Sequence, residues 1–277
     1  PHDYDITTSA LPEEVKEIFP HTVDTGIQHG TVTVIIDKTG YEITTYRIDG
    51  EYKDNRHPEE VIFTDRLSGD LSRRDFTINA IAYNDVKGYV DLFGGIEDIK
   101  RRVIRGVGEP AKRFQEDALR MMRAVRFSAQ LDFAIEENTL NALKENADLI
   151  RNISIERIRE EFFKLILSDH NERLDILLNS GMTEHFLPEI LNKKFDYGKI
   201  NSLSRDIVVR LAYIFYGIEW GNVKKIMKRL RTDNKSMAAV TLISKYTDYE
   251  IIDLYSMRKL VSLTEENIKR VIEVMCA

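Results

Sequence analysis

The spacing of apolar residues changes once along this chain, after Gly94 and Gly95. Before that point, Thr31–Ile36 and Tyr41–Tyr46 have the alternation and β-branched content of strands, and the turn-forming sequence Asp-Lys-Thr-Gly between them indicates a hairpin. From Ala111 onward, apolar residues recur every three or four positions, as in amphipathic helices. We therefore predict an α+β protein, with a mixed-sheet domain over residues 1–98 followed by an all-helical remainder.

The alternation of strands and the three- to four-residue spacing of helices also predict individual elements. Ile78–Tyr83 and Tyr89–Phe93 are predicted to be further strands of the first domain. Ser154, which precedes an apolar-periodic stretch, is predicted to start a helix.

Composition indicates a folded, helix-rich protein. Apolar residues make up 43% of the 277 residues, and only 14 glycines and 6 prolines interrupt them. The longest mostly apolar stretch, Ile207–Ile218, contains Arg210 and is far shorter than the ~20 residues that a bilayer span needs. Cys276 is the only cysteine, which excludes an internal disulfide and favours a reducing, cytoplasmic location. Because Pro1 opens the chain without a Met, we expect an N-terminal part of the first domain to be missing.

Charge is unevenly distributed. The formal net charge is −6, yet the stretch from Lys100 to Arg126 is strongly basic. A shorter run from Lys224 to Arg231 contains lysines and arginines and no acid. Such runs occur both on solvated helix faces and on surfaces that bind polyanions, so the pattern permits a nucleic-acid partner without requiring one.

Carboxylates suggest a metal site in the first domain. Asp3 and Asp5 are two residues apart, so on a strand they project from the same face. Glu42 lies in the middle of the predicted hairpin, where an unpaired acid is costly unless it faces a site. Carboxylates on adjacent strands can hold Mg²⁺ for nucleotidyl transfer. An Asp-X-Asp pair is also common on protein surfaces, so the pair alone leaves both interpretations open.

Two further groups of charged residues stand out. Arg73, Arg74 and Asp75 precede a predicted strand, and the planar guanidinium of arginine can bind phosphate or ribose oxygens through two hydrogen bonds. Later, Asp117 and Arg120 are spaced three apart, as are Arg120 and Arg123, so on a helix each pair would be neighbours. Surface arginine pairs and helix ion pairs are the alternative interpretations.

The polar stretch from Asp49 to Pro58, with Gly50 near its start, predicts a loop longer than a hairpin needs. Long loops in compact domains are often functional. Its other charged residues include Asp54, Arg56 and His57.

Five segments together resemble the ordered motifs of the class II tRNA nucleotidyltransferases, the CCA-adding enzymes and their bacterial poly(A) polymerase relatives. The resemblance is dense from Asp3 to about Leu167. The segments are Asp-Tyr-Asp-Ile-Thr-Thr-Ser-Ala, Tyr-Glu-Ile-Thr-Thr-Tyr-Arg, Ser-Arg-Arg-Asp-Phe-Thr-Ile-Asn-Ala, Glu-Asp-Ala-Leu-Arg-Met-Met-Arg and Ile-Ser-Ile-Glu-Arg-Ile-Arg-Glu-Glu. The Gly-Gly-x-Val-Arg-Asp segment that precedes the Asp pair in the family does not occur here, and the helical tail is shorter than in a full-length member.

The resemblance implies a polymerase-beta-like nucleotidyltransferase head over 1–98, a helical neck that reads the nucleotide over 99–167, and a tRNA-binding body and tail over 168–277. By the same resemblance, Asp49–Val61 matches a flexible loop that members adding the terminal A possess. The residues it assigns are Asp3, Asp5 and Glu42 as catalytic carboxylates, with Asp3 and Asp5 as metal ligands, Arg74 and Asp75 near the nucleotide sugar and phosphates, and Asp117, Arg120 and Arg123 at the base.

These residues lead us to expect an enzyme that adds C, C and A to the 3′ acceptor end of tRNA from CTP and ATP with Mg²⁺, without a membrane partner. Two alternatives remain open at this point. One is a poly(A) polymerase or an A-only enzyme of the same family. The other is a non-catalytic RNA-binding module, an alternative that stays open because the Gly-Gly segment is absent.

Overall fold

The computed structural model describes residues 4–50 and 61–277, and its contacts divide the chain into two units, 1–117 and 118–277. The first unit contains every described strand except Ala134–Ile135, and the second unit is otherwise helical. The predicted α+β class is therefore confirmed. The finer division at residues 98 and 167 stays a prediction.

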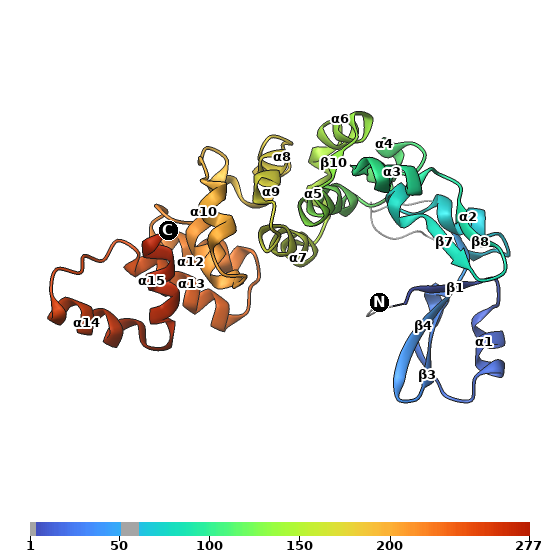
Figure 1. The fold of residues 1–277 in the computed structure, drawn as a ribbon, viewed down its shortest axis with the longest axis horizontal. Coiled ribbons are helices and arrows are strands. Elements are labelled where there is room, and N and C mark those ends of the chain that lie inside the picture. Colours follow the sequence, from blue (N-terminus) through green and yellow to red (C-terminus); the bar gives the residue numbers. More distant parts are fainter. Residues whose placement is uncertain (1–3, 51–60) are drawn as a thin grey trace. The chain divides into compact units, whose positions relative to one another are not determined.

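A four-stranded mixed sheet forms the start of the first unit (Figure 1). Its strands are β1 (Ile6–Thr8), β2 (Thr22–Gly26), β3 (Thr31–Ile36) and β4 (Thr39–Thr45). Their order is β1-β4-β3-β2, with β1 parallel to β4 and the other pairs antiparallel. Helix α1 (Pro12–Ile18) packs on one face, where Val15 joins a buried cluster with Val32, Val34 and Ile43. The opposite face carries threonines and Glu42 together with the exposed Val23 and Ile35.

The predicted hairpin is confirmed as β3 and β4, but its turn is shorter than expected. Only Asp37 and Lys38 separate the strands, and both have left-handed backbones, with φ of 50° and 65°. Such a turn matches the twist of the two strands. Thr39 and Gly40 therefore belong to β4, where they pair with Ile36 and Ile35 of β3.

The rest of the first unit contains short elements. The strand predicted over Ile78–Tyr83 begins only at Ile81, because a 3₁₀ turn over Thr77–Asn79 precedes it. Gly95 packs tightly against that turn: a Cβ there would lie 2.2 Å from the Thr77 carbonyl oxygen. The elements are η1 (Ile27–His29), β5 (Arg47–Asp49), β6 (Val61–Phe63), α2 (Leu67–Ser72), η2 (Thr77–Asn79), β7 (Ile81–Asn84), β8 (Gly88–Asp91), α3 (Gly95–Arg101), β9 (Val103–Ile104) and α4 (Pro110–Glu116).

The second unit is built on packed helices. Helix α5 packs against α7 around the buried ion pair of Arg126 and Glu161, and α11, α12, α13 and α15 form a second group of packed helices. Helix α7 begins directly after Ser154, as predicted. No helix among residues 4–50 and 61–277 has the length and apolarity to cross a membrane. The helices and strand are α5 (Leu119–Leu131), β10 (Ala134–Ile135), α6 (Glu137–Glu145), η3 (Ala147–Asn152), α7 (Ile155–Ile166), η4 (Asn171–Arg173), α8 (Leu174–Leu178), α9 (Thr183–Phe186), η5 (Pro188–Ile190), α10 (Tyr197–Ser202), α11 (Ile207–Ile214), α12 (Trp220–Arg229), α13 (Asn234–Tyr246), α14 (Leu254–Thr264), η6 (Glu265–Asn267) and α15 (Ile268–Cys276).

Candidate active site

Asp5 directly precedes β1, and Glu42 lies in the paired strand β4 at the corresponding position. Ile6 of β1 pairs with Ile43 of β4 in parallel register, and each carboxylate directly precedes one of these isoleucines. One position earlier still, the rings of Tyr4 and Tyr41 lie 6.4 Å apart, as expected if the two segments run side by side past Asp5 and Glu42. Because side chains alternate along strands, the two carboxylates share the face opposite that tyrosine pair. Asp3 lies outside the described residues.

This face of the sheet is exposed to solvent near the carboxylates. Glu42 and Asp5 are exposed, and the same face presents threonines that bond across strands, with Thr31 3.0 Å from Thr44 between their hydroxyl oxygens. The predicted cost of an unpaired acid in the strand therefore does not arise, because Glu42 is solvated. What distinguishes Glu42 is that its position in the register adjoins that of Asp5.

The two carboxylates fit a divalent cation. Within the described part of the chain, neither Asp5 nor Glu42 has a lysine or arginine partner, and two neighbouring carboxylates without a cation repel each other. Hard cations such as Mg²⁺ prefer oxygen ligands and tolerate an open coordination sphere. The chemistry of this donor set is therefore suited to such an ion.

A buried aspartate that our sequence reasoning missed fixes the arginine pair. Asp70 on α2 is fully buried, and its Oδ1 accepts from Nη2 of Arg73 at 2.6 Å. Its Oδ2 accepts from Nη2 of Arg74 at 3.3 Å. Burial of Tyr46 and the negative charge of Asp70 raise the pKa of Tyr46. Spacings of three and four residues to Arg73 and Arg74 are the signal that could have identified Asp70.

Arg74 and Asp75 belong to one hydrogen-bonded turn. The Asp75 carboxylate is 9% exposed and accepts from the Phe76 backbone N–H at 2.9 Å and the Asn79 amide at 3.0 Å. Nη1 of Arg74 donates to the Asn79 carbonyl at 3.3 Å. These contacts hold the segment before β7 in shape. The predicted roles of Arg74 and Asp75 toward a nucleotide stay predictions.

The prediction that Asp117 and Arg120 are neighbours on one helix is wrong. Helix α4 ends at Glu116 and α5 begins at Leu119, so Asp117 lies in an extended junction, with φ −140° and ψ 103°. Asp117 and Arg120 are therefore not neighbours on one helix. Aspartate competes for backbone hydrogen bonds and favours helix ends, which explains the break. Arg120 and Arg123 do share α5, and Arg123 lies over the Phe127 ring at 5.2 Å.

The predicted loop starts later than expected. Asp49 is the last residue of β5 and pairs with Val61 of β6, so the connection begins at Gly50 and joins two antiparallel strands. Asp54, Arg56 and His57 lie outside the described residues.

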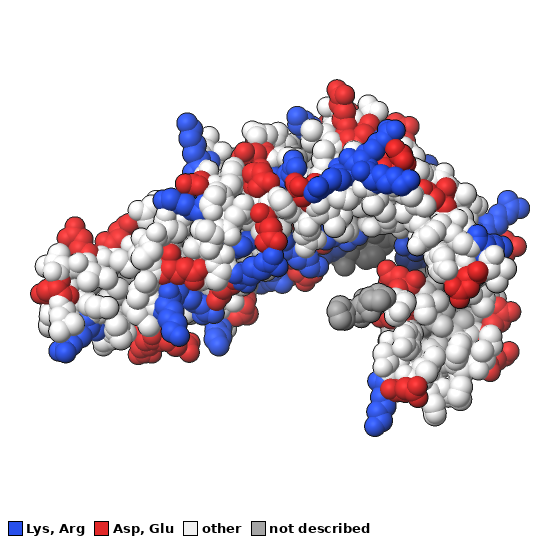
Figure 2. Space-filling model, viewed as in Figure 1, with Lys and Arg blue, Asp and Glu red and all other residues white. Residues whose placement is uncertain are grey.

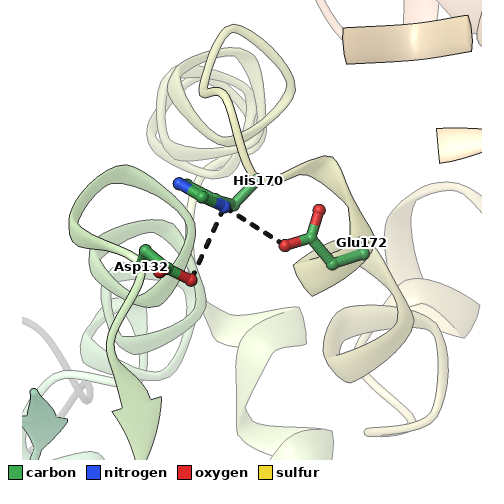
Figure 3. Close-up of side chains that lie close together, drawn as sticks. All are labelled: Asp132, His170 and Glu172. Carbon is green, nitrogen blue, oxygen red and sulfur yellow. Dashed lines mark ion pairs between the residues drawn. The ribbon is translucent and has the colours of Figure 1, made fainter. Parts of the chain in front are cut away.

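A separate cluster in the second unit joins Asp132, His170 and Glu172 (Figure 3). Nδ1 of His170 lies 3.5 Å from the Asp132 carboxylate and 3.3 Å from that of Glu172. Nη2 of Arg173 lies 3.3 Å from the same Asp132 oxygen. A guanidinium on that oxygen indicates an ion-pair cluster and disfavours an added metal cation at this position.

Two family models match the chain. Residues 1–105 match the poly A polymerase head domain, and residues 132–194 match the probable RNA and SrmB-binding site of polymerase A. The CCA-adding enzyme of Lactobacillus helveticus is 45% identical over 253 residues, covering 89% of this chain and 63% of its own length. That of Pediococcus pentosaceus is 40% identical over 280 residues, covering 99% of this chain and 70% of its own length. The chain thus spans about two thirds of these relatives.

A solved structure agrees with the sequence comparisons. The Bacillus stearothermophilus CCA-adding enzyme in complex with CTP superimposes with a TM-score of 0.84 at 36% identity, over 98% of this chain and 68% of that one. A CCA-adding enzyme in its apo form has the same fold at 21% identity, with a TM-score of 0.74 over 99% of this chain and 70% of that one. This likeness confirms the polymerase-beta-like head followed by helices. The chain belongs to the family of CCA-adding enzymes, the class II tRNA nucleotidyltransferases with their poly(A) polymerase relatives.

Proposed function

We propose that this protein adds C, C and A to the 3′ end of tRNA from CTP and ATP. The observation on which this rests is the placement of Asp5 and Glu42 at neighbouring positions on the open face of the head sheet. The family supplies the reaction type, since the relatives are named CCA-adding enzymes and one was solved with CTP. A divalent metal follows from the family, and we propose that it is Mg²⁺.

In this reaction, the 3′ hydroxyl of the RNA bonds to the α-phosphorus of the nucleotide, and pyrophosphate leaves. Asp5 and Glu42, with Asp3, would hold the metal, which when bound lowers the pKa of the attacking hydroxyl and neutralises charge on the phosphates. Asp70 holds the guanidinium groups of Arg73 and Arg74 in place. We propose that these preorganised groups bind the triphosphate of the nucleotide. The tRNA acceptor end would lie on the helical unit and be held through its backbone.

Asp117 and Arg120 are proposed to read the incoming base. Arginine only donates hydrogen bonds and ionised aspartate only accepts them. Cytosine and adenine both present a ring-nitrogen acceptor beside an amino donor, which complements this pair. Guanine and uracil present a ring N–H and a carbonyl at the corresponding positions, so both contacts become repulsive. Because Asp117 lies in the junction before α5, the conformation of that junction sets the separation of the two groups.

We expect Arg120→Ala to lower the use of CTP and ATP and to narrow their advantage over UTP and GTP by ~10–100-fold. The reason is that a mispaired polar group in a closed pocket costs ~1–3 kcal/mol. The measurement is kcat/KM for all four nucleotides. Lys112→Gln on α4 is a control, since Lys112 is an exposed cation near the same junction. If Arg120→Ala leaves the ratio of kcat/KM for CTP and ATP to that for UTP and GTP unchanged, Arg120 has only a structural role.

The activity itself is tested by product lengths. The substrates are tRNA transcripts that end before the CCA, after C or after CC, each incubated with single and paired nucleotides. Addition of CC followed by one A supports the proposal. Long A tracts identify a poly(A) polymerase, A added only to CC ends identifies an A-only enzyme, and binding without incorporation identifies a non-catalytic module.

We also propose that the protein works in the cytoplasm. tRNA and the nucleoside triphosphates would be its partners there. The single cysteine, Cys276, is a free and exposed thiol, which suits a reducing compartment.

A further inference from the structure

Arg113 on α4 contacts two segments of the first unit to which the proposed function gives different roles. Its Nη1 donates to the carbonyl oxygen of Ser72 at 3.0 Å, although the two residues are 41 positions apart in the chain. Its Nη2 donates to Oε1 of Glu116, on the same helix, at 2.5 Å. Its own carbonyl oxygen accepts from the backbone N–H of Asp117 at 3.3 Å. Arg113 therefore joins the end of α2 to the junction that follows α4, and all four residues belong to the first unit.

The guanidinium of Arg113 is withdrawn from solvent. Many lysine and arginine side chains project from the surface of the protein (Figure 2). The side chain of Arg113, by contrast, is only 13% exposed, and that of Glu116 is 14% exposed. In the ion pair of Arg101 with Glu97 on α3, the exposed fractions are 64% and 54%. The shielded pair is held in one geometry, because breaking it would leave a charge with little access to water.

Ser72 is the last residue of α2 and directly precedes the arginine pair. The last carbonyls of a helix have no partner within the helix, so a cationic side chain can satisfy them. Arg113 does so for Ser72, while Asp70 holds the guanidinium groups of Arg73 and Arg74. The turn that carries the two arginines is thus fixed both at Asp70 and at Ser72.

The backbone makes a second connection between the same two regions. Residues 75–77 and 105–107 are joined by an isolated antiparallel bridge, whose two hydrogen bonds are 2.9 and 3.1 Å long. This bridge holds the segment just before α4, which begins at Pro110, whereas Arg113 holds the last turn of that helix. Loss of the Arg113 side chain therefore leaves the bridge in place and releases mainly the junction at Asp117.

We propose that Arg113 is a positioning residue that sets which bases the protein accepts. The proposal rests on the proposed function, in which Asp117 reads the base and Arg73 and Arg74 bind the triphosphate. Arg113 fixes Asp117 relative to these two arginines, so that the edge of the base meets the carboxylate while the phosphates are bound. It acts through Asp117 and does not itself read the base.

Base selection depends on this placement, because a hydrogen bond weakens steeply once its distance or angle departs from the optimum. The Asp117 carboxylate favours cytosine and adenine only while it lies within hydrogen-bond distance of their amino groups. It disfavours guanine and uracil only while it is held against their carbonyls. A junction that can move weakens both effects, and a displacement of ~1 Å is sufficient to change a rate by about 10²-fold.

The test measures kcat/KM for CTP, ATP, UTP and GTP in R113M, which removes both side-chain hydrogen bonds and keeps an unbranched side chain. We expect the ratio of the values for CTP and ATP to those for UTP and GTP to fall about tenfold. Partial unfolding cannot produce this result, because it lowers the concentration of active protein equally for all four nucleotides and cancels in the ratio. An unchanged ratio overturns the inference.

R113K serves if R113M does not fold. Lysine keeps a positive charge beside Glu116, but its single ammonium cannot reproduce two hydrogen bonds made by separate nitrogens. The ratio is expected to fall in R113K as well, and a wild-type ratio in a folded R113K likewise overturns the inference.

R101M is the matched control. It removes an arginine that pairs with a glutamate on the neighbouring turn of α3, in the same unit, and it changes the net charge equally. R101M should keep the wild-type ratio. Equal falls in R101M and R113M would show a general effect of charge and would overturn the positioning role.

Action through Asp117 is tested by combining R113M with D117A. We expect the double variant to have the nucleotide ratio of D117A alone, because a carboxylate that is absent cannot be misplaced. Additive losses in the logarithm of the ratio would show that Arg113 acts elsewhere, contrary to the proposal.

The proposed function is judged by a separate measurement. Titration calorimetry with CTP and with UTP reports nucleotide preference without incorporation. If the wild-type chain adds no nucleotide but prefers CTP, and R113M loses that preference, the proposed function fails and the positioning role stands. If the wild-type chain adds C, C and A and R113M keeps the ratio, the positioning role fails and the function stands. A wild-type chain without nucleotide preference in either assay overturns both.

Discussion

We expect Asp5→Asn and Glu42→Gln each to lower nucleotide incorporation by about 10²–10⁴-fold and to leave tRNA affinity nearly unchanged. A metal held by carboxylates supplies several kcal/mol of transition-state stabilisation, and each 1.36 kcal/mol corresponds to a tenfold change in rate. The carboxylates sit on the sheet face of the head, whereas RNA affinity is assigned to the helical unit. The measurement is single-turnover incorporation of CMP and AMP at saturating RNA, with binding measured in parallel.

Glu17→Gln on α1 is the matched control, since Glu17 is an exposed carboxylate on a helix that covers the other face of the same sheet. It should retain full activity. Asp3→Asn is expected to behave like Asp5→Asn, by the family resemblance. Wild-type turnover by Asp5→Asn or Glu42→Gln at saturating Mg²⁺ would remove the metal assignment.

Arg210→Met should destabilise the helical unit by about 3–5 kcal/mol. Arg210 is 1% exposed and has no carboxylate partner among the described residues; carbonyl oxygens satisfy its guanidinium instead. Burial lowers the pKa of Arg210, yet an arginine stays charged at neutral pH. Methionine would remove this donor from four carbonyls, of which only that of Ser168 has a second donor within the described ranges, the Asn171 amide at 2.9 Å. The four carbonyls belong to Ile166 at 2.6 Å, Ser168 at 2.7 Å, Ser204 at 3.1 Å and Leu203 at 3.2 Å.

Arg205→Met provides the comparison. Arg205 is exposed and pairs with the exposed Asp169, and such surface pairs contribute ~0–1 kcal/mol. Denaturant unfolding followed by circular dichroism gives the two free energies of unfolding. Hydrogen exchange of 155–166 and 207–214 should accelerate in Arg210→Met and not in Arg205→Met. Equal stability of the two variants would show that water replaces the guanidinium.

Local patterns in the sequence were sufficient to predict the elements that depend on local structure. The hairpin of β3 and β4 and the start of α7 after Ser154 follow from side-chain alternation, helical spacing and capping preference. The strand predicted from Ile78 was placed too early, because the tight packing of Gly95 against the 3₁₀ turn at Thr77 involves residues distant in sequence. Alternation alone cannot reveal such packing.

The sequence by itself determined the α+β class and, through ordered motifs, the family and the candidate residues. Only the tertiary structure decided which of them meet. The parallel pairing of β1 with β4 brings Asp5 and Glu42 to adjacent positions, and the extended junction separates Asp117 from α5. Ion pairs also depend on the tertiary structure, since Arg229 pairs with Glu189 and Arg231 with Glu156. The physical reason is that register, burial and charge neutralisation depend on partners far apart in the chain, which the local spacing of residues does not encode.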